Sequence, residues 1–205
     1  MKIMYKLTDS KMRTYKEFQW ELGKWYKKTK EENLCSPDWL HFYSDPLVGL
    51  FLNPVHIDIE NPRLFRAEVE GNFIDNNGLN CGYSRARLIE ELPVPQISPV
   101  QRVRFAIFCV KEVYKEKKWN EWADNWLSGK DRTEESATSA AYTAENKTSA
   151  FYAVENTIIT FYAARSRESA FYAAKSATKS TEIASSTTKN KKIDLIGIAQ
   201  KAMEE

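Results

Sequence analysis

The chain has 205 residues, of which 30 are lysine or arginine and 28 are aspartate or glutamate, so its formal net charge at pH 7 is only +2. This charge is too small to indicate nucleic-acid binding, and we expect nucleic acid not to be the main partner. No stretch approaches the roughly 20 apolar residues of a membrane-spanning helix, and the first residues lack the apolar core of a signal peptide, so the sequence predicts a cytoplasmic protein without a membrane partner.

Two kinds of sequence meet near residue 130. All seven prolines lie at or before Pro99 and all six tryptophans at or before Trp126, whereas the only glycine after Gly129 is Gly197. Frequent proline and glycine residues are typical of a sequence that forms strands and turns, while an Ala-rich stretch without proline favours helix. The predicted class is α+β. Its expected parts are a small mixed β-sheet domain over residues 1–97, a connecting amphipathic helix over 98–129, a decapeptide-repeat helical region over 130–190 and a C-terminal amphipathic helix over 191–205.

The sequence of the first part of the N-terminal domain predicts short strands and one short helix. Ile3 to Leu7 is a strand candidate, and the aromatic stretch from Tyr15 to Tyr26 is compatible with helix or strand. Trp39 to Tyr43 is typical of a half-buried strand because aromatic residues fit a pleated surface. Leu47 to Leu52 predicts a helix that ends before Asn53-Pro54, since the residue before proline is pushed out of the helical region.

A hairpin is predicted next. Leu64 to Glu70 alternates apolar with charged residues, which is the period of a strand with one face in water, and Gly71 ends it. Asp75-Asn76-Asn77-Gly78 is typical of a hairpin turn. Arg85 to Leu92 is the following strand and completes the small mixed sheet.

The clearest local signal is a helix start at Ser98. Proline follows at the first helical position, and Gln101 stands three residues after the serine. Together they form a capping box, in which two side chains satisfy free amide groups at the helix N-terminus. Apolar residues then recur every three or four positions, so the pattern predicts one continuous helix to Ser128-Gly129.

A row of tryptophans extends that helical pattern. Trp119, Trp122 and Trp126 keep the spacing of three and four. The row predicts a packing seam between the sheet domain and the helical tail. The alternative is an exposed ridge that binds a partner, because tryptophan is enriched at binding hot spots.

The C-terminal third repeats one ten-residue phrase, with Ala141-Tyr142 as its first copy. In a straight helix, equivalent residues of successive ten-residue repeats are rotated about 80° from one another around the helix axis. They lie on one face only if the helix overwinds or wraps around a partner. Small residues beside each aromatic pair favour packing of one helix on another, so we expect a homo-oligomer. A solvated helix without a partner and a β-solenoid are the alternatives. The expected interface residues are Phe151, Tyr152, Ile158, Phe161, Tyr162, Phe171 and Tyr172.

Motifs that carry catalysis or bind metal are scarce. The sequence has no Gly-x-Ser-x-Gly, no phosphate-binding glycine loop and no His-Glu-x-x-His, and its two histidines, His41 and His56, lie in different predicted elements. Cys35, Cys81 and Cys109 include no Cys-x-x-Cys pair, which indicates reduced structural thiols and no metal site. The sequence therefore favours a non-enzymatic protein without a cofactor.

One aromatic and basic set is the candidate site for a small ligand. Aromatic rings and positive groups together suit an anionic ligand with a planar part. The alternative interpretation is that the arginines form solvent-exposed strand faces. The set comprises Trp39, Tyr43, Arg63, Arg66, Tyr83, Arg85 and Arg87.

Five strings stand in order along the first part of the chain: Phe18 to Tyr26, Leu34-Cys35, Leu40 to Pro46, Arg66 to Gly71 and Ile89 to Leu92. In this order they resemble an uncharacterised domain family of phages and prophages whose members often carry short repeats after the domain. The resemblance covers roughly residues 1 to 115 and implies a phage-encoded accessory protein in a bacterial host cell, with interference in a host defence system as an expected role. A host protein or a small signalling nucleotide is the partner that such a role implies.

An alternative resemblance concerns enzymes. The order of Leu40 to Leu52 and a later glutamate is similar to ADP-ribosyltransferase-like folds, which implies an NAD-using enzyme. On this alternative His41 and Tyr43 hold the nicotinamide side, and Glu91 stabilises the charge that develops at the ribose.

Overall fold

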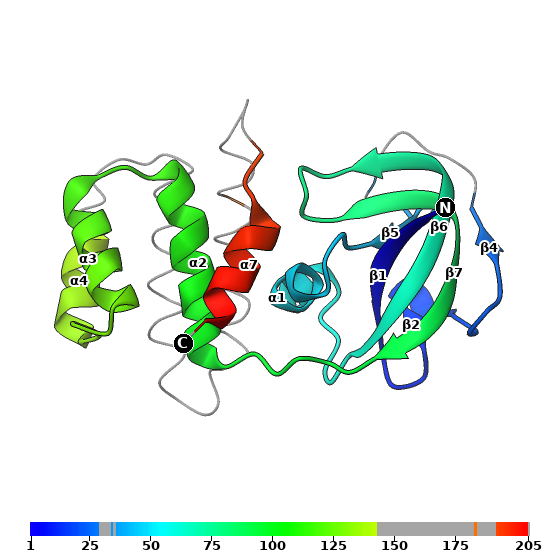
Figure 1. Cartoon of the computed structure of the whole chain (residues 1–205), viewed down its shortest axis with the longest axis horizontal. Helices are drawn as coiled ribbons and strands as arrows, with labels where there is room; N and C mark the ends of the chain where they lie inside the picture. The colour runs from blue at the N-terminus through cyan, green and yellow to red at the C-terminus, as the bar shows by residue number, and fades with distance from the viewer. Residues whose placement is uncertain (29–33, 35, 143–182, 184–191, 205) are drawn as a thin grey trace. The chain divides into compact units, whose positions relative to one another are not determined.

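The computed structural model describes residues 1–28, 34, 36–142, 183 and 192–204, and it divides the chain into two compact units, Met1–Gln96 and Ile97–Glu205 (Figure 1). We call them unit 1 and unit 2. The described part of unit 1 contains a five-stranded sheet, a two-stranded sheet and one α-helix, and the described part of unit 2 is helical, so the protein is α+β. The expected oligomer interface from Phe151 to Tyr172 lies outside the described residues.

Unit 1 begins and ends with strands of one sheet. The stretch from Tyr15 to Tyr26, which the sequence left open between helix and strand, forms short strands and a single 3-10 turn. The elements in chain order are β1 (Lys2–Thr8), β2 (Arg13–Thr14), η1 (Tyr15–Glu17), β3 (Phe18–Gln19), β4 (Tyr26–Lys27), β5 (Leu40–Phe42), α1 (Pro46–His56), β6 (Arg63–Asp75) and β7 (Cys81–Leu92).

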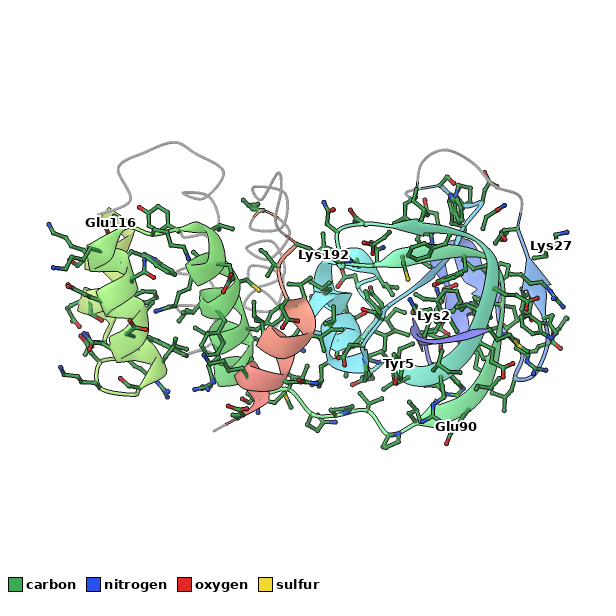
Figure 2. All side chains as sticks on the ribbon, turned by 45° about the horizontal axis from the view of Figure 1, so that its top comes forward. Lys2, Tyr5, Lys27, Glu90, Glu116 and Lys192 are labelled. Atoms are coloured by element: carbon green, nitrogen blue, oxygen red, sulfur yellow. The ribbon has the colours of Figure 1, made fainter. Side chains whose placement is uncertain are left out.

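The named strands of the main sheet of unit 1 all pair antiparallel, in place of the expected mixed sheet, and the parallel contact among the described residues is an isolated bridge between Leu22 and Leu88. The order of the main sheet is β1-β6-β7-β4, and β5 also pairs with β7. A short turn joins β6 to β7 and imposes the antiparallel direction on that pair, whereas the other pairs join strands that are distant in the sequence. Tyr5 on β1, labelled in Figure 2, exchanges two backbone hydrogen bonds of 2.9 Å with Tyr43, which follows β5. The hydrogen-bonded path through β1, β6, β7 and β5 therefore returns to β1 and encloses a core.

The β6–β7 hairpin confirms the predicted turn and corrects one strand end. Leu79 N donates to Asn76 O at 2.9 Å, and Asn77 and Gly78 both have positive φ, 49° and 82°, which is the type I′ pattern. Gly71 does not end its strand: β6 continues to Asp75, and the pairing register shifts between Glu70 and Phe73. Gly71 has a φ of 86° and lies in this bulge, which bends the strand instead of ending it.

Helix α1 packs against β1 and extends past the predicted end. Asp45 caps its N-terminus by accepting from Leu47 N at 2.8 Å. The helix passes through Pro54 to His56, so the expected end before Asn53-Pro54 was wrong. Burial of its apolar residues outweighs the local restriction by proline, and the Asn53 carbonyl accepts from Ile57 N, which fixes the last turn.

The described part of unit 2 consists of four helices, α2 (Pro99–Val113), α3 (Lys117–Leu127), α4 (Glu134–Tyr142) and α7 (Leu195–Met203). The capping box at Ser98 is confirmed, with Gln101 N donating to Ser98 Oγ at 3.2 Å and Ser98 N donating to Gln101 Oε1 at 2.8 Å. Helix α7 packs on α2. Among the described residues, no helix is both long enough and apolar enough to cross a membrane.

The predicted continuous helix from Ser98 to Ser128 is two helices. Tyr114 is extended, and α3 begins after Glu116. The Glu116 carboxylate accepts from Trp119 N at 2.6 Å and Lys118 N at 3.0 Å, so this residue starts a new helix although the apolar spacing continues across the break.

The tryptophan row is a packing seam, as predicted, but its partners lie within unit 2. Trp119, Trp122 and Trp126 are buried, with exposed fractions of 0%, 6% and 2%. They pack in one cluster with residues of α2 and α4, namely Val103, Ile107, Val110, Ala137 and Ala140. The seam therefore joins α3 to its neighbouring helices, and the exposed-ridge alternative was wrong.

The Ser98 cap provides a first test of this architecture. We expect Ser98→Ala to lower the free energy of unfolding by about 1 kcal/mol, because the Gln101 amide loses its acceptor, Ser98 Oγ. Urea unfolding followed by circular dichroism measures the change. Ser128→Ala is the matched control, since Ser128 lies at a helix C-terminus and its hydroxyl only donates to Asn125 O at 3.0 Å. Equal losses in both variants would contradict the role of the cap.

Candidate functional site

The structure separates the predicted ligand set into an ion-pair ladder and buried rings. Its four arginines each pair with a carboxylate on the neighbouring strand, across β6 and β7. Such exposed pairs contribute little to stability, and they leave no arginine of the set without an acidic neighbour. The arginines therefore form solvent-facing strand faces. The pairs are Arg63–Glu91 at 2.5 Å, Arg66–Glu90 at 2.7 Å, Arg87–Glu68 at 2.6 Å and Arg85–Glu70.

The aromatic members of the set lie in the core. Trp39, Tyr43 and Tyr83 have exposed fractions of only 4%, 4% and 6%. Tyr43 lies against α1 so closely that a Cβ on Gly49 would be 2.8 Å from the Tyr43 ring, which explains why glycine stands at this helix position. These rings belong to the core, so none of them is exposed for stacking on a ligand.

The residues proposed for an NAD-using enzyme are not brought together. His41 pairs with Gly82 on β7, whereas Glu91 lies nine residues further along the same strand (91 − 82), opposite Phe65. Nine strand residues span about 30 Å. The Arg63 guanidinium also engages Glu91 and holds the pKa of that carboxyl below its usual value. Tyr43 lies two residues from His41, but Glu91 cannot act at the same ligand atoms.

A residue that the sequence analysis did not single out, Lys6, occupies the most unusual position in unit 1. Its side chain is 5% exposed, and Nζ donates to His41 O at 2.6 Å. Nζ also lies 5.5 Å from the ring centre of Trp20 and 5.3 Å from that of Phe42, distances at which an ammonium interacts with aromatic faces. In the described part of the chain, Lys6 forms no ion pair with a carboxylate.

The physical consequence is a shifted protonation equilibrium. Removal of the ammonium from water lowers the pKa of Lys6 from 10.5 to about 7, and the neighbouring Cys81 thiol acts in the opposite direction. A buried lysine with such a pKa exists partly as a neutral amine at neutral pH. Perturbed groups of this kind are concentrated at functional sites.

His41, whose backbone carbonyl accepts from Lys6 Nζ, is one of two histidines in this part of unit 1, and His56 lies near enough to His41 to affect its charge. The Nε2 atom of His41 is 2.6 Å from Leu34 O, so Nε2 carries the proton and donates. The pKa of His41 is lowered, first by burial and then by the positive charges of Lys6 and His56, against the effect of the Leu34 carbonyl. The Tyr43 and His56 rings stack with centres 6.0 Å apart, and Tyr43 Oη is 3.3 Å from His56 Nδ1. We call Lys6, His41 and His56 the basic cluster.

Cys81 and Cys109 are both buried, which fits structural cysteines. Cys81 Sγ donates to Phe42 O at 3.5 Å, which places the thiol in the core beside the basic cluster. Cys35 lies outside the described residues. Within the described part of the chain, no three His, Cys, Asp or Glu side chains are arranged to hold a metal ion.

The sequence carries only a weak signal for this site. Apolar residues occupy both faces of β1, since Met4 and Leu7 are both buried, and Lys6 shares the face of Met4. A lysine inside a strand that is apolar on both faces is the signal that could have identified it. Its aromatic contacts, by contrast, depend on how β1, β5 and the Trp20 segment meet in space.

Comparison of the chain with protein-family models, with characterised proteins and with solved structures finds no match. The functional proposal for unit 1 therefore depends on its geometry, and above all on the basic cluster.

Proposed function

We propose that this chain is a non-enzymatic, phage-encoded accessory protein that binds a small anionic ligand at the basic cluster. The observation that carries the proposal is the buried Lys6 side chain, which has no carboxylate partner in the described residues and lies beside His41. A buried positive charge without a counter-ion is costly. An anion at this position would lower that cost, so it would bind more tightly here than at a solvated lysine.

We expect the ligand to carry a planar ring as well as charge, because Trp20 and Phe42 face Lys6. Both rings are buried in the free protein, so a ligand ring would contact them only by displacing part of the core around Lys6. A small signalling nucleotide combines phosphate charge with a ring of this kind. Sequestration of such a nucleotide is consistent with interference in a host defence system, and the repeat tail would assemble several copies of the binding unit.

Calorimetric titration of the full chain tests this function. The ligands are nucleoside monophosphates, cyclic dinucleotides and NAD, each titrated into wild type, Lys6→Met and Lys24→Met. Lys24 is the matched control because it is an exposed lysine of the same unit, ion-paired with Glu21 at 2.5 Å. We expect Lys6→Met to weaken binding at least tenfold, about 1.4 kcal/mol, and Lys24→Met to leave it unchanged.

Proton uptake gives a second readout of the same binding. An anion favours the ammonium form of Lys6, so the pKa of about 7 in the free protein would rise on binding. Affinity is then constant well below pH 7 and falls as the pH increases through 7, and calorimetry in two buffers of different ionisation enthalpy detects the proton taken up. No heat from any of the ligands, or equal weakening by Lys6→Met and Lys24→Met, would overturn the proposed function.

A further inference from the structure

We infer that an open groove in unit 2 binds small organic phosphate esters. Residues of α2 and α3 line this groove together with residues from Lys192 through α7, and its volume is about 640 Å³. Sites for small molecules usually measure roughly 300 to 1,000 Å³. The groove belongs to unit 2 and Lys6 to unit 1, so this inference does not depend on the proposed function. We call it the α2–α7 groove.

Two positive groups meet at one aromatic ring in the α2–α7 groove. Arg104 and Phe108 stand one turn apart on α2, and Lys201 belongs to α7, which packs along α2 (Figure 1). The Lys201 Nζ atom lies 4.5 Å and the Arg104 Cζ atom 5.6 Å from the centre of the Phe108 ring. An aromatic ring attracts cations to its face, so Phe108 keeps both positive charges at the groove.

These two cations lack an acidic partner. Among the residues that the structure describes, neither Arg104 nor Lys201 forms an ion pair. Arg104 Nη2 donates to Lys201 O at 3.3 Å, whereas Arg104 Nε is buried without a hydrogen-bond partner. A guanidinium has five N–H groups, so Arg104 has more donors than the described residues accept from. The two positive charges also repel each other, and an anion between them would offset that repulsion.

The acidic side chains of the groove do not take the place of such an anion. Asp124 pairs with Lys111, and Asp194 Oδ1 accepts from Gly197 N at 3.0 Å, which caps α7. Glycine at position 197 leaves the room that this carboxylate needs, since a Cβ there would clash with Asp194 Oδ2. Glu112 is exposed, and water screens its charge. The groove therefore keeps a positive region around the Phe108 ring.

A phosphate ester matches both the charge and the walls of the groove. A phosphate monoester carries nearly two negative charges at pH 7, and its oxygens accept from two N–H groups of a guanidinium at once. An ammonium group adds a compact second charge. The apolar side chains of Phe108, Leu127 and Ile198 also line the groove and suit the organic part of the ester. We therefore expect a monoester with a small apolar group to bind more tightly than free phosphate.

Titration of the full chain with phenyl phosphate tests the inference, with the ¹⁵N-labelled backbone amides observed by NMR. We expect the amides of α2 and α7 near Arg104 and Lys201 to shift, with a dissociation constant of about 1 mM or below. Inorganic phosphate and phenol represent the two halves of the probe. Each should bind about tenfold more weakly or worse, because each contacts only part of the groove.

Three variants show whether the two cations hold the phosphate. Lys201 is exposed, so Lys201→Met should leave the fold intact and weaken phenyl phosphate binding about tenfold. Arg104→Lys keeps the charge but removes the planar fork, and it should weaken binding about fivefold. Lys118→Met is the matched control, since Lys118 is an exposed lysine of α3 that does not line the groove. This variant should bind as the wild type does.

The possible outcomes separate this inference from the proposed function. Absence of shifts in α2 and α7, or phenol binding as tight as that of phenyl phosphate, would overturn the inference. Equal weakening by Lys118→Met and Lys201→Met would also overturn it, because the probe would then respond only to overall charge. Lys6→Met should leave the shifts in α2 and α7 unchanged. Shifts confined to unit 1 and lost in Lys6→Met would refute the groove while they support the proposed function.

Discussion

Replacement of Lys6 by methionine stabilises the protein at pH 6, and the gain shrinks as the pH rises. The pKa of Lys6 is about 7 in the folded chain and 10.5 for an ordinary lysine. Each tenfold difference in proton affinity corresponds to about 1.4 kcal/mol, so burial of the ammonium costs at most about 5 kcal/mol. Methionine is nearly the same length, fits among aromatic rings and needs no hydration.

The sign of the pH dependence follows from which state binds the proton. Below pH 7 Lys6 is charged in both the folded and the unfolded chain, and the full cost of burial is present. Between pH 7 and 10.5 the unfolded chain binds more protons than the folded chain, so the stability of the wild type increases with pH. Above 10.5 both states are neutral, and the advantage of methionine disappears.

We expect a net gain of about 1 to 3 kcal/mol for Lys6→Met at pH 6, because the loss of the hydrogen bond to His41 O offsets part of the relief. Urea unfolding of both proteins at pH 6, 8 and 10 measures it. Lys24→Met removes the same charge from an exposed position and should show no such trend. A variant that is less stable than wild type at pH 6 would show that the ammonium is stabilised in the folded chain and would remove the basis of the proposed function.

Local chemistry made part of the fold predictable. Asn77-Gly78 specifies its turn because both central residues need a positive φ, and Ser98 with Gln101 specifies a helix start because its amide groups need acceptors. The break after Val113 was not predictable in the same way. Glu116 as a cap competes with an apolar spacing that continues to Trp119, and the outcome depends on how α3 packs on α2 and α4.

The site was harder to predict than the fold, because strand register decides it. The arginines of β6 and β7 look like a binding surface in the sequence, but the pairing of Arg66 with Glu90 and Arg87 with Glu68 neutralises them. Lys6 looks like one of many solvated lysines, but the return of the sheet to β1 through Tyr43 encloses it. Charge patterns therefore indicate ionisable residues without indicating which of them lose contact with water.

The core of unit 2 provides the second large expected effect. Trp119 is fully buried and contacts the rings of Tyr114 and Trp122, with centres 5.7 Å and 5.8 Å away. We expect Trp119→Ala to lower the free energy of unfolding by about 3 to 5 kcal/mol, since the cavity it leaves lies between helices that cannot fully collapse. Urea unfolding followed by circular dichroism measures this loss.

The indole N–H of Trp119 allows a more specific comparison, because its Nε1 atom is buried and has no hydrogen-bond partner among the residues that the structure describes. An unsatisfied buried donor costs about 1 to 3 kcal/mol, so Trp119→Phe removes that cost while it keeps an aromatic ring. Trp20 is the matched control: it is 1% exposed, and its Nε1 donates to Thr14 Oγ1 at 3.2 Å. We therefore expect Trp119→Phe to destabilise less than Trp20→Phe. The reverse order would mean that the Trp119 N–H finds an acceptor in solution, and the tryptophan seam would then be held by polar contacts as well as by packing.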